Sequence, residues 1–234
     1  MKEELINKLK LCFNKSPQEV VDYLKSQGIK VSSSWKEQLE IIRQHCFTVS
    51  KVFAADVLQA ILDALVKAIE NGTSFKDFKE NLSKTLAEKG FSHVNGSSWR
   101  LDTIYRTNLQ SSYMAGRYYN IMALQDEFPY WQYIAVMDIR TRPQHAAAHG
   151  KIVRADDPFW QKAYPPNGYN CRCRVRALSE EEVRARRLRV SIGNKIDFTP
   201  DDGFASNPAA EWKPNLNKFA PSIRKKLNEI LAGK

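Results

Sequence analysis

The chain has 234 residues, 43% of them hydrophobic and 11% aromatic, and this composition excludes an intrinsically disordered protein. No apolar run reaches the ~18 residues that a membrane span needs, and the charged N-terminus is unlike a secretory signal, so we expect a reducing compartment where the four cysteines form no disulfide framework. The net charge of +10 favours nucleic acids or acidic protein surfaces as partners.

The first hundred residues carry a series of helix signals. Capping boxes at Ser16–Glu19 and Ser34–Glu37 each predict the start of a helix. Apolar residues recur every four positions between 53 and 69, which is one face of an amphipathic helix. Ser74 is expected to cap a further short helix, before a turn-rich linker at 89–98. The side chains that this last helix is expected to bury are Phe75, Phe78, Leu82 and Leu86.

The second part of the chain mixes helices and short strands. A long helix is predicted from about Trp99 to Asp126, followed by a strand over Tyr130–Asp138. "RPQHAAAHG" predicts a short helix, "KIVR" a brief strand, "DDPFW" a turn and "CRCRVRA" a strand that alternates between two faces. A last amphipathic helix is expected from about Ser222.

These elements predict an α+β protein with three regions. Residues 1–98 form a helical N-terminal region suited to docking on other proteins. Residues 99–180 form a compact α+β module with a small sheet, and residues 181–234 form a basic, loop-rich C-terminal tail with a terminal helix.

Three segments carry a family resemblance: "LDTIYRTNLQSSYMAGRYYNI", "DIRTRPQHAAAHGKIVRADDPFW" and "YPPNGYNCRCRVRALS". In this order they resemble the phage Mu F-like family of minor head, or head morphogenesis, proteins. The resemblance implies a structural protein, not an enzyme, made in the bacterial host cytoplasm and carried in the interior of a phage or prophage head. It implies the portal protein and other head proteins as partners, no membrane and no small-molecule substrate. The implied role, at the portal vertex, is head assembly or delivery of the genome.

Two residue pairs suggest a metal site. His145 and His149 are four residues apart, so a helix would present both rings on one face. Cys171 and Cys173 are two apart, so a strand would point both sulfurs to one side. The four would suit a closed structural zinc site, and zinc is the one cofactor that the sequence suggests. The alternatives are plain packing, a nucleophilic cysteine or a Cys171–Cys173 disulfide. A metalloprotease is disfavoured, because Ala146 stands where the HExxH motif has its Glu.

A polar cluster lies where a strand is expected to pass into a helix. Arginine pairs readily with carboxylates, so we expect the cluster to pin the strand, the helix and the "DDPFW" loop together. The alternative is a phosphate-binding or catalytic pocket of an ADP-ribosyltransferase-like or nuclease-like toxin. The cluster comprises Asp138, Arg140, Thr141, Arg142, Asp156 and Asp157.

A basic stretch follows the cysteines. Its first three arginines would line one face of a strand, opposite the cysteines. Such a row could contact packaged DNA without reading its sequence, meet an acidic portal surface, or lie in solvent. A sequence-nonspecific DNA-binding module is therefore a third hypothesis. The arginines are Arg172, Arg174, Arg176, Arg184, Arg186, Arg187 and Arg189.

Overall fold

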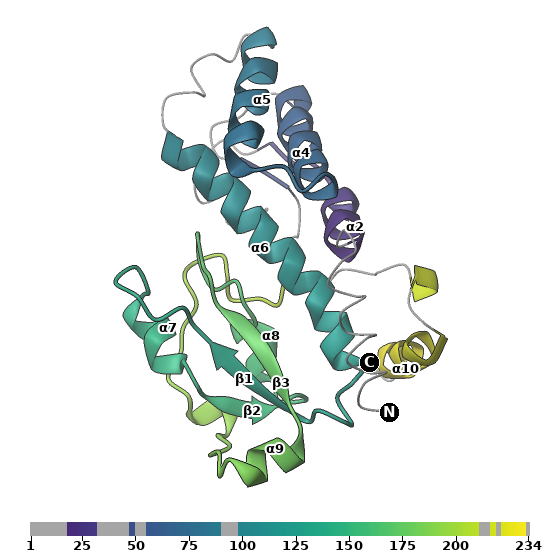
Figure 1. Cartoon of the computed structure of the whole chain (residues 1–234), viewed down its shortest axis with the longest axis vertical. Helices are drawn as coiled ribbons and strands as arrows, with labels where there is room; N and C mark the ends of the chain where they lie inside the picture. Colours follow the sequence, from purple (N-terminus) through teal and green to yellow (C-terminus); the bar gives the residue numbers. More distant parts are fainter. Residues whose placement is uncertain are drawn as a thin grey trace.

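The computed structural model describes residues 18–31, 47–49, 55–89, 98–210, 216–218 and 221–232. The predicted helix starts at Ser16 and Ser34, and most of the predicted linker at 89–98, lie outside these residues. Helices α2 (Gln18–Ser26), α4 (Ala55–Glu70) and α5 (Phe75–Glu88) gather along one half of the long helix α6 (Ser98–Met122), and the sheet lies beside its other half (Figure 1).

The helical core follows from the sequence periodicity. The predicted apolar face of α4 is buried through Val57, Ile61, Leu65 and Ile69. At the start of α5 the Ser74 hydroxyl accepts a hydrogen bond from the Asp77 amide at 3.2 Å, which confirms the predicted cap. Of the side chains expected to face inward from α5, Phe78, Leu82 and Leu86 are buried and Phe75 is half-buried.

Helix α6 belongs to two cores. Its first half, including Leu101 and Ile104, packs into the helical core formed with α2, α4 and α5. Its second half, including Met114 and Tyr118, packs into the core beneath the sheet. The predicted domain boundary after residue 98 therefore falls at the start of a helix that both cores share, and it stays a prediction.

The sheet has three antiparallel strands in the order β2-β1-β3. The central strand β1 (Tyr130–Ile134) pairs with β2 (Ile152–Arg154) and with β3 (Arg174–Leu178). Trp131 and Tyr133 point from β1 into the core, where Trp131 and Trp160 have ring centroids 5.6 Å apart. This arrangement confirms the predicted α+β class with a small sheet and a helical N-terminal half.

Short helices surround the sheet: α7 (Pro143–Ala148), α8 (Phe159–Ala163) and α9 (Glu180–Ala185). Helix α8 was not expected: the last two residues of the predicted "DDPFW" turn, Phe159 and Trp160, are its first turn. Strand β1 is shorter than predicted, because the chain leaves the sheet after Ile134. Strand β3 begins at Arg174, so Cys171 and Cys173 precede it, although the alternation of buried and exposed residues runs through all of them.

The C-terminal helix α10 (Pro221–Ala232) returns to the end of α6. Leu227 joins the core beneath the sheet, and the Lys226 ammonium lies 2.7 Å from the Asp126 carboxylate. Among the residues that the structure describes, no helix is both long enough and apolar enough to cross a membrane.

Candidate functional site

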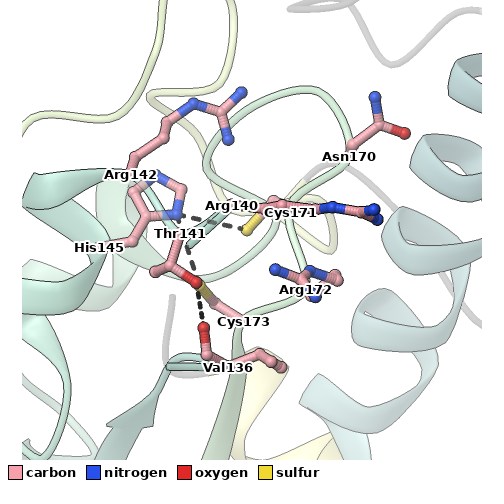
Figure 2. A pocket seen from close by; sticks show the side chains of 9 residues that line it. All are labelled: Val136, Arg140, Thr141, Arg142, His145, Asn170, Cys171, Arg172 and Cys173. Carbon is pink, nitrogen blue, oxygen red and sulfur yellow. Dashed lines mark hydrogen bonds between the residues drawn. The ribbon is translucent and has the colours of Figure 1, made fainter. Parts of the chain in front are cut away.

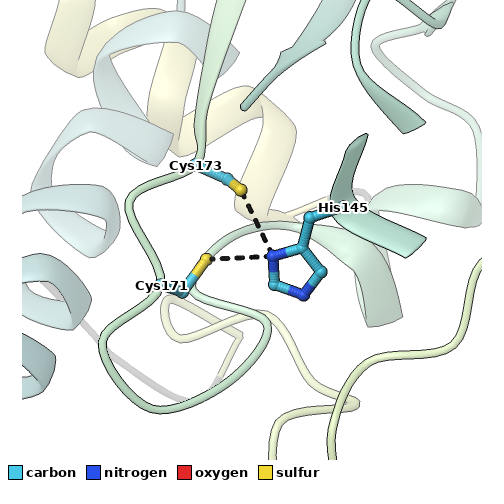
Figure 3. A group of neighbouring side chains, drawn as sticks. All are labelled: His145, Cys171 and Cys173. Atoms are coloured by element: carbon cyan, nitrogen blue, oxygen red, sulfur yellow. Dashed lines mark hydrogen bonds between the residues drawn. The ribbon is translucent and has the colours of Figure 1, made fainter. Parts of the chain in front are cut away.

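Three of the four predicted metal ligands meet in the core of the α+β module. The Nδ1 atom of His145 lies 3.4 Å from the Cys173 sulfur and 3.8 Å from the Cys171 sulfur. Figure 3 shows both sulfurs turned toward this ring nitrogen. The potential ligand atoms all lie within 4.8 Å of one another, and the three residues are at most 4% exposed. The site is therefore closed to bulk solvent on most sides.

His145 is carried by α7, whose first turn begins with Pro143. The side chain of Arg142, directly before this helix, donates to the Tyr169 carbonyl at 2.9 Å and pairs with Asp201 at 3.0 Å. The His145 ring also packs against Phe198, with ring centroids 5.7 Å apart. Contacts with two distant loops therefore fix the orientation of the helix and its histidine.

The two cysteines end a loop that starts after α8. Asn167 is fully buried in this loop, and its side-chain amide donates to the Tyr133 hydroxyl and the Ala163 carbonyl, both at 3.0 Å. Helix α6 holds the C-terminal end of this loop, because the Gln110 side-chain amide donates a hydrogen bond to the Cys173 carbonyl at 2.6 Å. The loop is thus tied to the central strand, to α8 and to α6 before it enters β3.

His149 does not join this group. Helix α7 ends at Ala148, and His149 has φ −56° and ψ 132°, outside the helical region. Its Nδ1 atom accepts a hydrogen bond from the Ala135 amide at 3.1 Å. The early end of the helix follows from Gly150, whose φ of +80° turns the chain toward β2. Histidines four residues apart share a face only while the helix continues, so the set of two His and two Cys is not assembled.

The environment of the two thiols is asymmetric. The pKa of the Cys171 thiol is lowered, because its sulfur forms hydrogen bonds with the Cys173 thiol, the His145 ring and the backbone amides of Asn167 and Cys173. The pKa of the Cys173 thiol is raised by the neighbouring Cys171 and by burial. Burial also raises the pKa of Tyr133, whose hydroxyl lies beside Cys173. The site therefore favours a negative charge on the Cys171 sulfur over one on the Cys173 sulfur.

A cavity of about 20 Å³ adjoins the three residues. Besides His145 and the cysteines, three arginines line it, and Figure 2 shows their side chains around the sulfurs. A volume of this size holds about one water molecule. The arginines are Arg140, Arg142 and Arg172.

The residues of the predicted polar cluster take part in several separate contacts and do not form one group. Asp138 makes a bidentate pair with Arg172 at 2.7 and 2.6 Å, and this pair holds the pKa of the Asp138 carboxyl below its usual range. Asp156 pairs with Arg154, from the adjacent strand. Asp157 accepts hydrogen bonds from the amides that begin α8 and the turn at Gly193.

Arg140 and Thr141 stay with Asp138 in the turn before α7, where the Arg140 amide and the Thr141 hydroxyl donate to its carboxylate. Arg142 instead pairs with Asp201, a residue outside the predicted cluster. Asn167 was also missed. The sequence feature that could have drawn attention to Asn167 is its position in "PPNGYN", beside two prolines and a glycine.

Four of the seven arginines of the basic stretch are paired within the molecule. Arg172 pairs with Asp138, Arg176 and Arg186 share Glu182, and Arg184 pairs with Glu180. Three are exposed and have no carboxylate partner among the described residues. These three are Arg174, Arg187 and Arg189.

Comparisons with known proteins give the family. The model of the Phage Mu protein F like protein family matches residues 59–176. The "Putative capsid assembly protein F" of Escherichia phage Mu is 41% identical over 238 residues, which cover 83% of this chain and 54% of that protein. The "Mu-like prophage FluMu F protein" of Haemophilus influenzae is 46% identical over 173 residues, which cover 70% of this chain and 42% of that protein.

The chain thus spans about half the length of these two relatives. No solved structure matches it. The family match covers half of the chain, includes His145, Cys171 and Cys173, and confirms the resemblance carried by the sequence motifs. The chain belongs to the Phage Mu protein F like family.

Proposed function

We propose that the chain is a minor structural protein of a tailed-phage or prophage head, which acts inside the head at the portal vertex during head assembly, genome delivery or both. Membership of the Phage Mu protein F like family supports this role, as does the similarity to a protein named as a capsid assembly protein. The protein would be made in the bacterial cytoplasm and carried in the virion. Its main partners would be the portal protein and other head proteins.

The loop between β1 and α7 is the observation that carries a docking role. Met137 is 59% exposed and Ile139 is fully exposed, and Val136 is exposed beside them. The loop is nevertheless held in place, since the Thr141 hydroxyl donates to the Val136 carbonyl and Asp138 is paired with Arg172. A held loop that presents adjacent apolar side chains to water is suited to burial against another protein.

Contact with packaged DNA is a secondary role in this proposal. Of the seven arginines in the basic stretch, only Arg174, Arg187 and Arg189 have no carboxylate partner within the described part of the chain. Three phosphate contacts would make the logarithm of the binding constant fall with the logarithm of salt concentration at a slope of about 2.7. A much steeper slope would favour the DNA-binding hypothesis over the portal hypothesis.

The toxin-like enzyme is not favoured by the geometry around the arginines. The cavity lined by Arg140, Arg142 and His145 has a volume of about 20 Å³, which suits a water molecule and not a nucleotide or nicotinamide. His149 does not line this cavity, because its ring accepts a hydrogen bond from the Ala135 amide. A structural role therefore accounts best for the arrangement.

The test is to locate the full-length protein in heads. We expect an affinity-tagged protein to label a single vertex of purified heads, and to co-purify with portal protein. A double variant, Met137→Ser with Ile139→Ser, is expected to lower this co-purification at least tenfold. Ile192→Ser is the matched control, since Ile192 is also exposed but lies elsewhere. Label spread over all vertices, or an equal loss in the control, would contradict the proposal.

A further inference from the structure

The positions of the His145, Cys171 and Cys173 ligand atoms match those of a metal site. A tetrahedral zinc ion with bonds of about 2.3 Å to sulfur and about 2.05 Å to nitrogen holds these ligand atoms about 3.6 Å apart. The two observed distances from the His145 Nδ1 atom to the sulfurs, 3.4 and 3.8 Å, lie on either side of that value. The third pair, the two sulfurs, also lies within 4.8 Å.

The local chemistry supports a cation at this point. The three side chains are at most 4% exposed, and both sulfurs are turned toward the same His145 ring nitrogen, so an ion bound between them would be shielded from bulk solvent (Figure 3). His145 supplies a nitrogen ligand, and soft sulfur ligands select zinc over magnesium or calcium.

The described residues provide three protein ligands and an adjoining cavity at the fourth coordination position. No further His, Cys, Asp or Glu joins the group in the described residues, and His149 is engaged with the Ala135 amide. The cavity of about 20 Å³ is lined by the three ligands and provides room for one water molecule.

We propose that His145 Nδ1 and the thiolates of Cys171 and Cys173 bind one Zn²⁺ ion, with a water molecule in the adjoining cavity as the fourth ligand. The ion would tie α7 to the loop that leads into β3. This role differs from the closed site of two His and two Cys, because one position stays open to exchange. It is also independent of the proposed role at the portal vertex.

The first experiment is cobalt titration and elemental analysis of the full chain, purified under reducing conditions without chelator. We expect one metal per chain, and Co²⁺ should give the thiolate charge-transfer and tetrahedral d–d bands of a two-sulfur site. Cys171→Ser and Cys173→Ser should each weaken zinc binding by more than about 100-fold, since even the partners of metal ligands cost 10–100-fold. His149→Gln is the matched control and should bind as the unaltered chain does.

A second measurement covers the case in which the cysteine variants fail to fold. In the unaltered chain, zinc should protect the Cys171 and Cys173 thiols from a thiol reagent, and a chelator should remove this protection. Absence of metal binding by the unaltered chain, or an equal loss in His149→Gln, would overturn the site. The water ligand has its own test: thiocyanate should shift the d–d bands of the cobalt form, and an unchanged spectrum would refute the open position.

Discussion

Replacing Asn167 by alanine tests whether the cysteine loop is held by the buried amide. The variant removes two hydrogen bonds of 3.0 Å from a fully buried side chain, to the Tyr133 hydroxyl and the Ala163 carbonyl. Each bond contributes about 1 kcal/mol net, and both acceptors would be left without their donor, so the expected loss is about 2–3 kcal/mol. The backbone carbonyl of Asn167 would still accept the Asp201 amide, so the loop keeps one anchor.

The measurement is guanidinium unfolding followed by tryptophan fluorescence, since Trp131 and Trp160 lie in this core. Tyr133→Phe removes only one of the two bonds and should cost about 1 kcal/mol. The double variant should show a coupling of about 1 kcal/mol between the two positions, because they share a hydrogen bond. A loss below 1 kcal/mol for Asn167→Ala, or strictly additive losses, would refute this account of the loop.

Three further changes test the packing and capping of the fold by the same unfolding assay. A Cβ atom on Gly193 would lie 2.6 Å from the Phe159 Cβ atom, so Gly193→Ala should cost about 1–3 kcal/mol, whereas Gly28→Ala has open space and should change stability by less than about 0.5 kcal/mol. Ser74→Ala should cost about 1 kcal/mol through loss of the cap, and Ser74→Asp should retain it. Leu82→Ala, in the helical core, should cost about 2–5 kcal/mol. Equal unfolding midpoints for Gly193→Ala and Gly28→Ala would contradict the tight packing at Gly193. A Ser74→Asp variant no more stable than Ser74→Ala would contradict the cap at Ser74.

The helical part of the fold could be predicted because its signals are local. The cap at Ser74 and the four-residue spacing of apolar side chains on α4 depend only on neighbours within a turn or two. The end of β1 and the short helix α8 were missed. They depend on contacts with other segments, such as the Ala135 amide leaving the sheet to bind His149.

The candidate site likewise has some residues whose positions follow from local sequence patterns and others whose positions depend on distant contacts. The alternation through Cys171 and Cys173 put both sulfurs on one side, and His145 on the expected helix faces them. The prediction for His149 required one more turn of helix, and the chain turns away at Gly150 instead. The pairing of Asp138 with Arg172 could not be read from the sequence, because the partners are 34 residues apart and each had nearer candidates.

Helix α6 has a mechanical consequence. Its 25 residues form a rod about 37 Å long, and no proline interrupts it. One end is embedded in the helical core and the other in the core beneath the sheet, which also supports the cysteine loop. A force applied to the helical core is therefore transmitted along this rigid helix to the sheet. The two halves of the molecule should consequently rotate together when a neighbouring protein binds to either one.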